Sequence, residues 1–103
     1  MRFIDARTFT ADRPWGALDI TNLDEATVRL HWTDQPYVWH VNDASEVFIV
    51  LDGAVDMHYR QDGEERFERL VPGQICCAEA GDDHVARPAP VARILVIERK
   101  GSV

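Results

Sequence analysis

The sequence predicts an all-β fold, either a sandwich or a barrel. Polar and apolar residues alternate in several short segments, turn-forming residues recur roughly every eight to twelve positions, and no stretch has the 3.6-residue period of an amphipathic helix. The chain has 103 residues, of which 46% are hydrophobic, and this is enough for one packed core. We therefore expect a single domain that spans residues 1–103.

The first half of the chain predicts several strands. Residues 17–20 can form a short strand, residues 27–32 alternate as in a half-buried strand, and residues 37–42 follow a turn at Pro36. Residues 47–51 form a continuous apolar run, as in a buried strand, and Asp52-Gly53 closes it with a strong hairpin signal. The alternation over 27–32 puts Val28, Leu30 and Trp32 on one face and Thr27, Arg29 and His31 on the other.

The second half continues the pattern. Residues 54–60 alternate, which turns Met57 and Tyr59 to the inner face and His58 to the outer face. A hairpin turn over residues 61–64 then precedes an exposed strand and a short buried one, at 66–71 and 75–78. We expect Pro88-Ala89-Pro90 to break the chain before a last strand at 91–98.

Charge and composition exclude several classes of partner. The net charge of −7 and a sequence pI near 4.9 argue against nucleic acid or an anionic membrane. The first residues are too polar for a secretory signal, and no apolar run approaches the roughly 20 residues of a membrane span, so we expect a cytoplasmic protein. Adjacent Cys76 and Cys77 face opposite ways in a strand and are expected to be unpaired thiols.

Two motifs carry the chemistry. In the first, His40 and Asn42 lie two apart and share a face of a strand, and Glu46 can join them if the turn at 43–45 folds the next strand alongside. In the second, glycine turns flank a short apolar segment and deliver His84. An imidazole, an amide and a carboxylate over a β-surface indicate a metal or small-molecule site.

Together the two motifs resemble those of the cupin family. Its first motif has two histidines two apart, then a glutamate and a glycine, and His40, Asn42, Glu46 and Gly53 have this spacing. The second motif is matched by Gly73, Glu79, Gly81, His84 and Pro88. Asn42 replaces a histidine, Glu79 a proline and Pro88 an asparagine. The resemblance implies a double-stranded β-helix, the jelly-roll barrel of small, RmlC-like cupins.

By this resemblance, His40, Asn42, Glu46 and His84 would line the barrel mouth and hold a divalent metal, which is Zn, Fe, Mn or Ni. Two imidazoles and one carboxylate suit such a metal and leave coordination positions open. An amide oxygen is a poorer donor, so Asn42 would be a weak fourth ligand, hold a metal-bound water, contact substrate, or be a turn residue that bonds nearby backbone.

The remaining candidates have plainer interpretations. Phe48, Met57 and Tyr59 have the parity of a pocket wall, although core packing would explain them equally well. His31 and His58 belong to no ligand cluster and are expected to be structural, and Glu79 is expected at the surface.

Three functions follow from the resemblance. The protein would bind or act on a small organic molecule, such as a sugar derivative or an organic acid, with the help of the metal. Alternatively, it is a non-catalytic binding or sensing module whose metal site has degenerated through Asn42. The third possibility is an Fe(II)-dependent dioxygenase. A homodimer is expected because the chain is small and the edges of its sheets need cover.

Overall fold

The computed structural model of the chain describes residues 1–101, which form one 3₁₀ turn and seven strands. The elements are η1 (Ala6–Thr8), β1 (Gly16–Leu23), β2 (Ala26–Thr33), β3 (His40–Val41), β4 (Glu46–Gln61), β5 (Glu64–Leu70), β6 (Ile75–Ala78) and β7 (Asp83–Arg99). The described part contains no helix with the length and apolarity that crossing a membrane requires. The all-β prediction is confirmed.

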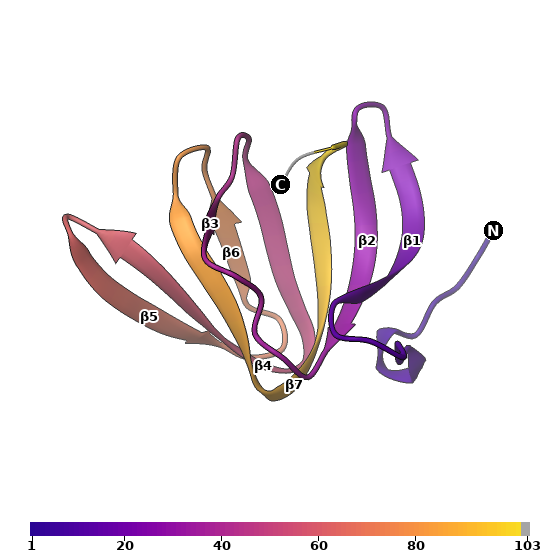
Figure 1. Ribbon diagram of the computed structural model, residues 1–103. Helices are drawn as coiled ribbons and strands as arrows, with labels where there is room; N and C mark the ends of the chain where they lie inside the picture. The colour runs from indigo at the N-terminus through magenta and orange to yellow at the C-terminus, as the bar shows by residue number, and fades with distance from the viewer. Residues whose placement is uncertain (102–103) are drawn as a thin grey trace.

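All strand pairs are antiparallel and belong to one continuous, strongly bent sheet (Figure 1). The main order is β1-β2-β7-β4-β5, with β3 added beside β7 and β6 beside β4. Strands β4 and β7 run through the bend, so each belongs to both arms of the sheet. The sheet is not closed, which is consistent with the predicted jelly roll.

Strand β4 corrects one prediction, because Asp52-Gly53 does not end it in a hairpin. The strand continues from Glu46 to Gln61, and its register with β7 shifts on both sides of this dipeptide. Gly53 has φ +75°, and a Cβ there would lie 2.0 Å from the Val91 carbonyl oxygen. A positive φ serves a β-bulge as well as a hairpin turn. The glycine therefore bends a strand that the sequence suggested would stop.

Strand β7 corrects a second prediction. Pro88-Ala89-Pro90 does not break the chain, and β7 runs from Asp83 to Arg99. Val55 of β4 lies opposite Pro88, and Gly53 lies opposite Ala92, so the two long strands bend at the same place. Proline is tolerated in a sheet where the ladder is already interrupted. The two apparent breaks are therefore one shared bend.

The hydrophobic core lies on the concave side of this bend. Its buried members are Phe48, Val50, Val55, Met57, Leu70, Ala86, Ala92, Ile94 and Val96, and Trp15 and Cys76 pack at its margin. Most of them alternate along β4 and β7, where one face of a strand packs inward. The core fills the base of the fold and leaves the open end of the concave side to polar side chains.

Candidate functional site

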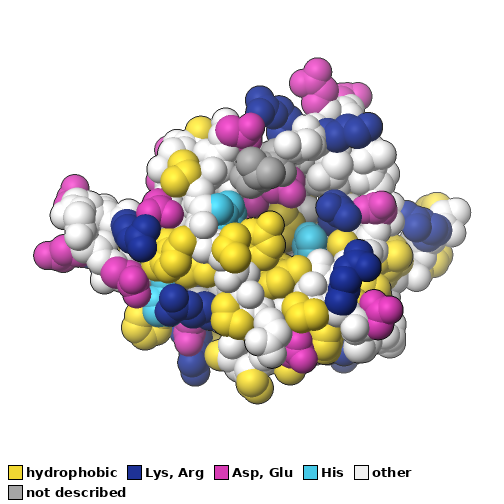
Figure 2. All heavy atoms as spheres, in the orientation of Figure 1, with side chains coloured by type: hydrophobic (Ala, Val, Ile, Leu, Met, Phe, Trp, Pro, Cys, Tyr) yellow, Lys and Arg dark blue, Asp and Glu magenta, His cyan; other side chains and the backbone are white. Residues whose placement is uncertain are grey.

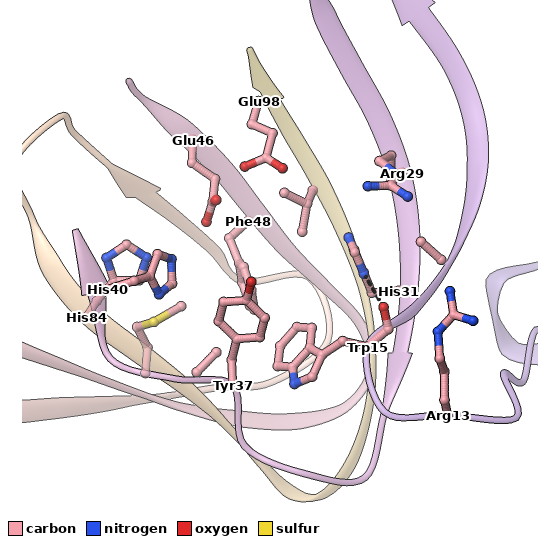
Figure 3. Close-up of a pocket in the computed structure, with 14 residues that line it drawn as sticks. Arg13, Trp15, Arg29, His31, Tyr37, His40, Glu46, Phe48, His84 and Glu98 are labelled. Carbon is pink, nitrogen blue, oxygen red and sulfur yellow. Dashed lines mark hydrogen bonds between the residues drawn. The ribbon is translucent and has the colours of Figure 1, made fainter. Parts of the chain in front are cut away.

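A cavity of about 330 Å³ opens on the concave side of the sheet (Figure 3). Figure 2 shows this face with hydrophobic side chains gathered at its centre, histidines beside them and arginine or lysine side chains further out. The lining residues are Arg13, Trp15, Ala17, Arg29, His31, Tyr37, His40, Glu46, Phe48, Met57, His84, Ala86, Val96 and Glu98. Three histidines, two glutamates and two arginines thus share one space with an apolar wall.

Cross-strand register places the polar groups of one arm. Glu46 of β4 lies opposite Glu98 of β7, and the next inward row joins Phe48, Val96 and Arg29. Residues in one row of a sheet project to the same face. The polar face of β2 therefore lines the cavity with Arg29 and His31. Alternation in the sequence shows that this face is polar, but it does not show whether the face meets solvent or a ligand cavity.

His40 and His84 form the polar end of the other arm. They are opposite each other on β3 and β7, and their ring centroids lie 4.5 Å apart. Nδ1 of His40 donates to the Val38 carbonyl at 2.9 Å, and Nδ1 of His84 donates to the Asp82 carbonyl at 3.1 Å. In the neutral form of each ring these bonds keep the proton on Nδ1 and the lone pair on Nε2, which is a tautomer that ligates metals.

Burial also keeps His84 neutral. Desolvation lowers the pKa of His84, and the nearby His40 lowers it further, although the bond to the Asp82 carbonyl acts in the opposite direction. A neutral imidazole is the form that binds a metal ion or accepts a hydrogen bond. The protonation of this histidine therefore suits either role at neutral pH.

Asn42 lies beside Glu46, as the shared face of His40 and Asn42 suggested. It is only 1% exposed, and its Nδ2 donates to Oε2 of Glu46 at 3.2 Å. Its Oδ1 is buried with no hydrogen-bond partner within residues 1–101. A buried acceptor without a partner is costly, so this oxygen is suited to a cation or to a hydrogen-bond donor of a ligand.

Glu98 is a site residue that the sequence reasoning missed. Burial, and then hydrogen bonding and repulsion between its carboxyl and that of Glu46, raise the pKa of Glu98 from 4.5 to about 7. His31 and Arg29 act in the opposite direction but more weakly. The two carboxyls therefore tend to hold one proton between them near neutral pH.

The donors match a divalent metal in type, although they are not assembled around one point. Two imidazoles that each donate through Nδ1, a carboxylate and an amide oxygen without a partner are suitable ligands. In the part of the chain that the structure describes, no three His, Cys, Asp or Glu side chains form a group that could hold a metal ion. Glu46 is instead engaged with Asn42 and Glu98.

An aromatic wall connects the two polar ends. Tyr37 makes edge contacts with Trp15 and His40, with ring centroids 5.3 Å and 5.1 Å apart. Trp15 has φ +62°, which is strained for a bulky residue. Nε1 of Trp15 donates to the Gln35 carbonyl at 2.9 Å, and Nδ1 of His31 donates to the Trp15 carbonyl at 3.1 Å. These bonds hold the indole at the cavity. The sequence had indicated Trp15 only as part of a turn before Gly16.

Two of the three predicted wall residues line this cavity. Phe48 and Met57 are buried and contribute to its lining. Tyr59 instead lines a neighbouring pocket, also of about 330 Å³, which shares Met57 and His84 with the first. Tyr59 is the cross-strand partner of His84, and His84 borders both pockets.

The histidines expected to be structural have different positions. His58 lies on the outer face, where it stacks on Phe67 and contacts Glu65 at 3.2 Å. His31 bonds the Trp15 carbonyl, which is the structural role expected of it, and it also lines the cavity. Burial lowers the pKa of His31. Glu79 is exposed, as expected.

Comparison with solved structures decides the fold family. A cupin-2 domain protein from Shewanella frigidimarina superimposes with a TM-score of 0.78 at 23% identity, covering 87% of this chain and 85% of that one. The chain has the cupin fold. No family model and no curated protein matches its sequence.

Longer cupin-fold enzymes are also similar. Hydroquinone 1,2-dioxygenase from Sphingomonas sp., with 4-hydroxybenzoate bound, gives a TM-score of 0.76 at 22% identity over 86% of this chain and 28% of that one. Hydroquinone 1,2-dioxygenase PnpCD in complex with Fe³⁺ gives 0.74 at 20% identity over 87% and 29%. Proteins with this fold thus bind metal and small molecules, and a fold likeness leaves the activity of this chain open.

Proposed function

We propose that this protein is a single-domain cupin that binds a small organic molecule in the main cavity, with a divalent metal held by His40, Glu46 and His84. The observation that carries the proposal is the facing pair of imidazoles, each fixed through Nδ1 and each with an available Nε2. Asn42, whose Nδ2 donates to Glu46, would be the weak fourth ligand through its Oδ1. A bound metal would supply open coordination positions and Lewis acidity.

The chain itself provides the rest of the binding site. Trp15, Tyr37, Phe48 and Met57 form an apolar wall that receives the body of a ligand and excludes water. His40 and His84 receive its polar end at one side of this wall. A sugar derivative or an organic acid is of suitable size and polarity.

A second candidate is a non-catalytic binding or sensing module. It is favoured by one observation, namely that Glu46 bonds Asn42 and contacts Glu98 instead of joining the histidines. The cavity would then bind its ligand without a metal. An Fe(II)-dependent dioxygenase is a narrower form of the first candidate, and oxygen uptake after anaerobic loading with Fe(II), measured against Glu46→Gln, tests it directly.

Metal titration distinguishes the two candidates. Untagged, chelator-treated protein is titrated with Zn(II) and Ni(II) by calorimetry, and the fresh protein is analysed for metal content. We expect one site per chain, lost in His84→Ala and retained in His58→Ala, a matched control because His58 lies on the outer face. Absence of binding in the wild type, or equal binding in the two variants, would contradict the metal site.

The assembly belongs to the same proposal. We propose a homodimer, because the structure leaves large apolar side chains such as Phe67 and Ile75 exposed on strands β5 and β6. Exposed apolar surface and open sheet edges favour association. The cytoplasmic location stays a prediction.

A further inference from the structure

The end of the cavity opposite the histidine pair carries two arginines (Figure 3). Arg29 comes from β2, and Arg13 comes from the turn before β1. Nε of Arg29 donates to Oδ1 of Asp19 at 2.8 Å, and Asp19 is outside the cavity lining. The terminal nitrogens of Arg29 and the whole guanidinium of Arg13 have no ion pair or hydrogen bond within residues 1–101. Two guanidinium groups with available donors thus border one cavity.

The space between the two polar ends is mostly apolar. Trp15 and Tyr37 stand on one side, and Phe48, Met57 and Val96 form the base. The strained backbone of Trp15 is held by two hydrogen bonds, so this wall is fixed before a ligand arrives. A rigid apolar wall between two polar ends fits a ligand with an apolar body and a charged group.

The guanidinium donors at this end are not used up by the neighbouring acidic groups. The protein carries a net charge of −7, and the titratable groups around the arginine end are His31, Glu46, Glu98 and Asp19, of which Asp19 is paired with Nε of Arg29. Glu46 accepts from Asn42, and neither Glu46 nor Glu98 forms an ion pair with Arg13 or Arg29 among the described residues. The terminal nitrogens of Arg29 and the guanidinium of Arg13 are therefore available to an anion in the cavity.

We propose that the ligand of this cavity is a small carboxylic acid with an apolar body, whose carboxylate is bound by Arg29 and Arg13 while its other end reaches the His40–His84 pair. The proposal rests on the proposed function, since it takes the same cavity as the ligand site. Arginine matches a carboxylate with two parallel donors, whereas a neutral sugar would leave the Arg13 guanidinium without an anionic partner. Of the two ligand classes considered above, the organic acid is therefore the one that fits.

Phenylacetate and phenylacetamide test this assignment, because they have nearly the same shape and differ in charge. Both are titrated by calorimetry into chelator-treated protein, so that coordination of the carboxylate to a metal cannot explain a preference. We expect the acid to bind about tenfold more tightly or better. Arg29→Gln and Arg13→Gln should each reduce this preference severalfold. Arg66→Gln, which removes an exposed arginine of β5 paired with Glu64, should leave it unchanged.

Three results would overturn the assignment. The first is equal affinity for acid and amide, which would leave the cavity as a ligand site without the carboxylate. The second is a preference that survives in both arginine variants, with thermal unfolding used to confirm that each variant is folded. The third is that neither probe binds, or that phenethylamine, a cation of similar shape, binds more tightly than phenylacetate. The result with phenethylamine would assign recognition to the carboxyl pair of Glu46 and Glu98. The metal titration of His84→Ala tests the proposed function separately.

Discussion

The pair formed by Glu46 and Glu98 is expected to make the folded state less stable as the pH rises. A carboxylate in an ion pair has the opposite effect, because its pKa is lowered by folding. The pKa of Glu98 is raised to about 7 in the folded chain, by burial and by the neighbouring carboxyl, from the 4.5 of an unperturbed glutamate. Between these two values the folded state holds a proton that the unfolded state has released. Stability is therefore lost as the pH rises from about 4.5 to 7 and is level above that range.

The size of the effect follows from the pKa difference. At about 1.4 kcal/mol per pKa unit, a change from 4.5 to about 7 corresponds to about 3 kcal/mol. Glu98 is only half-buried, and solvent screening reduces this to about 1–2 kcal/mol. Glu98→Gln removes the titration and keeps a side chain that can donate to Glu46. The variant should therefore match the wild type at pH 5 and be about 1–2 kcal/mol more stable at pH 8.

Urea unfolding of chelator-treated protein at several pH values between 4.5 and 8 measures this difference. Buried His31 and His84 have lowered pKa values and contribute with the opposite sign, since they gain protons on unfolding. Their contribution is common to the wild type and the variant, so the comparison isolates Glu98. Glu79→Gln, at an exposed position, is the matched control and should keep the wild-type profile. An identical pH profile in Glu98→Gln and the wild type would refute the shared proton.

Four further outcomes are expected. Asn42→His adds a nitrogen ligand beside Glu46 and should tighten the binding of Zn(II) or Ni(II), measured by calorimetry, at least about tenfold. An unchanged affinity would show that residue 42 does not face the metal. Metal affinity should fall steeply below about pH 6, as protons compete for the imidazoles, and a flat profile would argue against histidine ligands. Gly53→Ala should destabilise the fold by about 1–3 kcal/mol more than Gly63→Ala, as measured by chemical denaturation. Both glycines have a positive φ, but only a Cβ at residue 53 would collide with backbone atoms. Equal losses of stability in the two variants would contradict this reasoning. Sedimentation at micromolar concentration should give a dimer, and a monomer alone would end that proposal.

Local patterns were sufficient for the fold class and insufficient for the strand ends. Alternation around Met57 and the shared parity of Phe48 and Glu46 correctly predicted inward faces. Gly53 misled the prediction because a positive φ is needed both in a hairpin and in a bulge, and only the partner strand distinguishes the two. The prolines at 88 and 90 misled it for the same reason, since they fall where the ladder with β4 is already shifted.

The candidate site was predictable where it follows local motifs. His40 and Glu46 fall within one short stretch and His84 lies in the second motif, and all three line the cavity. Their role as metal ligands stays a prediction. Arg29 and Glu98 belong to no motif, and they meet Glu46 only because β2, β7 and β4 pair in one particular register. A strand with one apolar and one polar face gives no sign of whether its polar face meets water or a cavity.

Asn42 and Glu98 are better understood together than apart. A second carboxyl beside Glu46 introduces repulsion, and an amide that donates to Glu46 offsets part of it. A neutral histidine at residue 42 with its lone pair turned to a metal could not donate in that direction. The departure from the family motif therefore has a physical reason within this chain, because Asn42 supports the carboxyl pair in the absence of a metal. The same bond keeps Glu46 away from the histidines, so the stability of the carboxyl pair and the affinity for metal are expected to oppose each other at this residue.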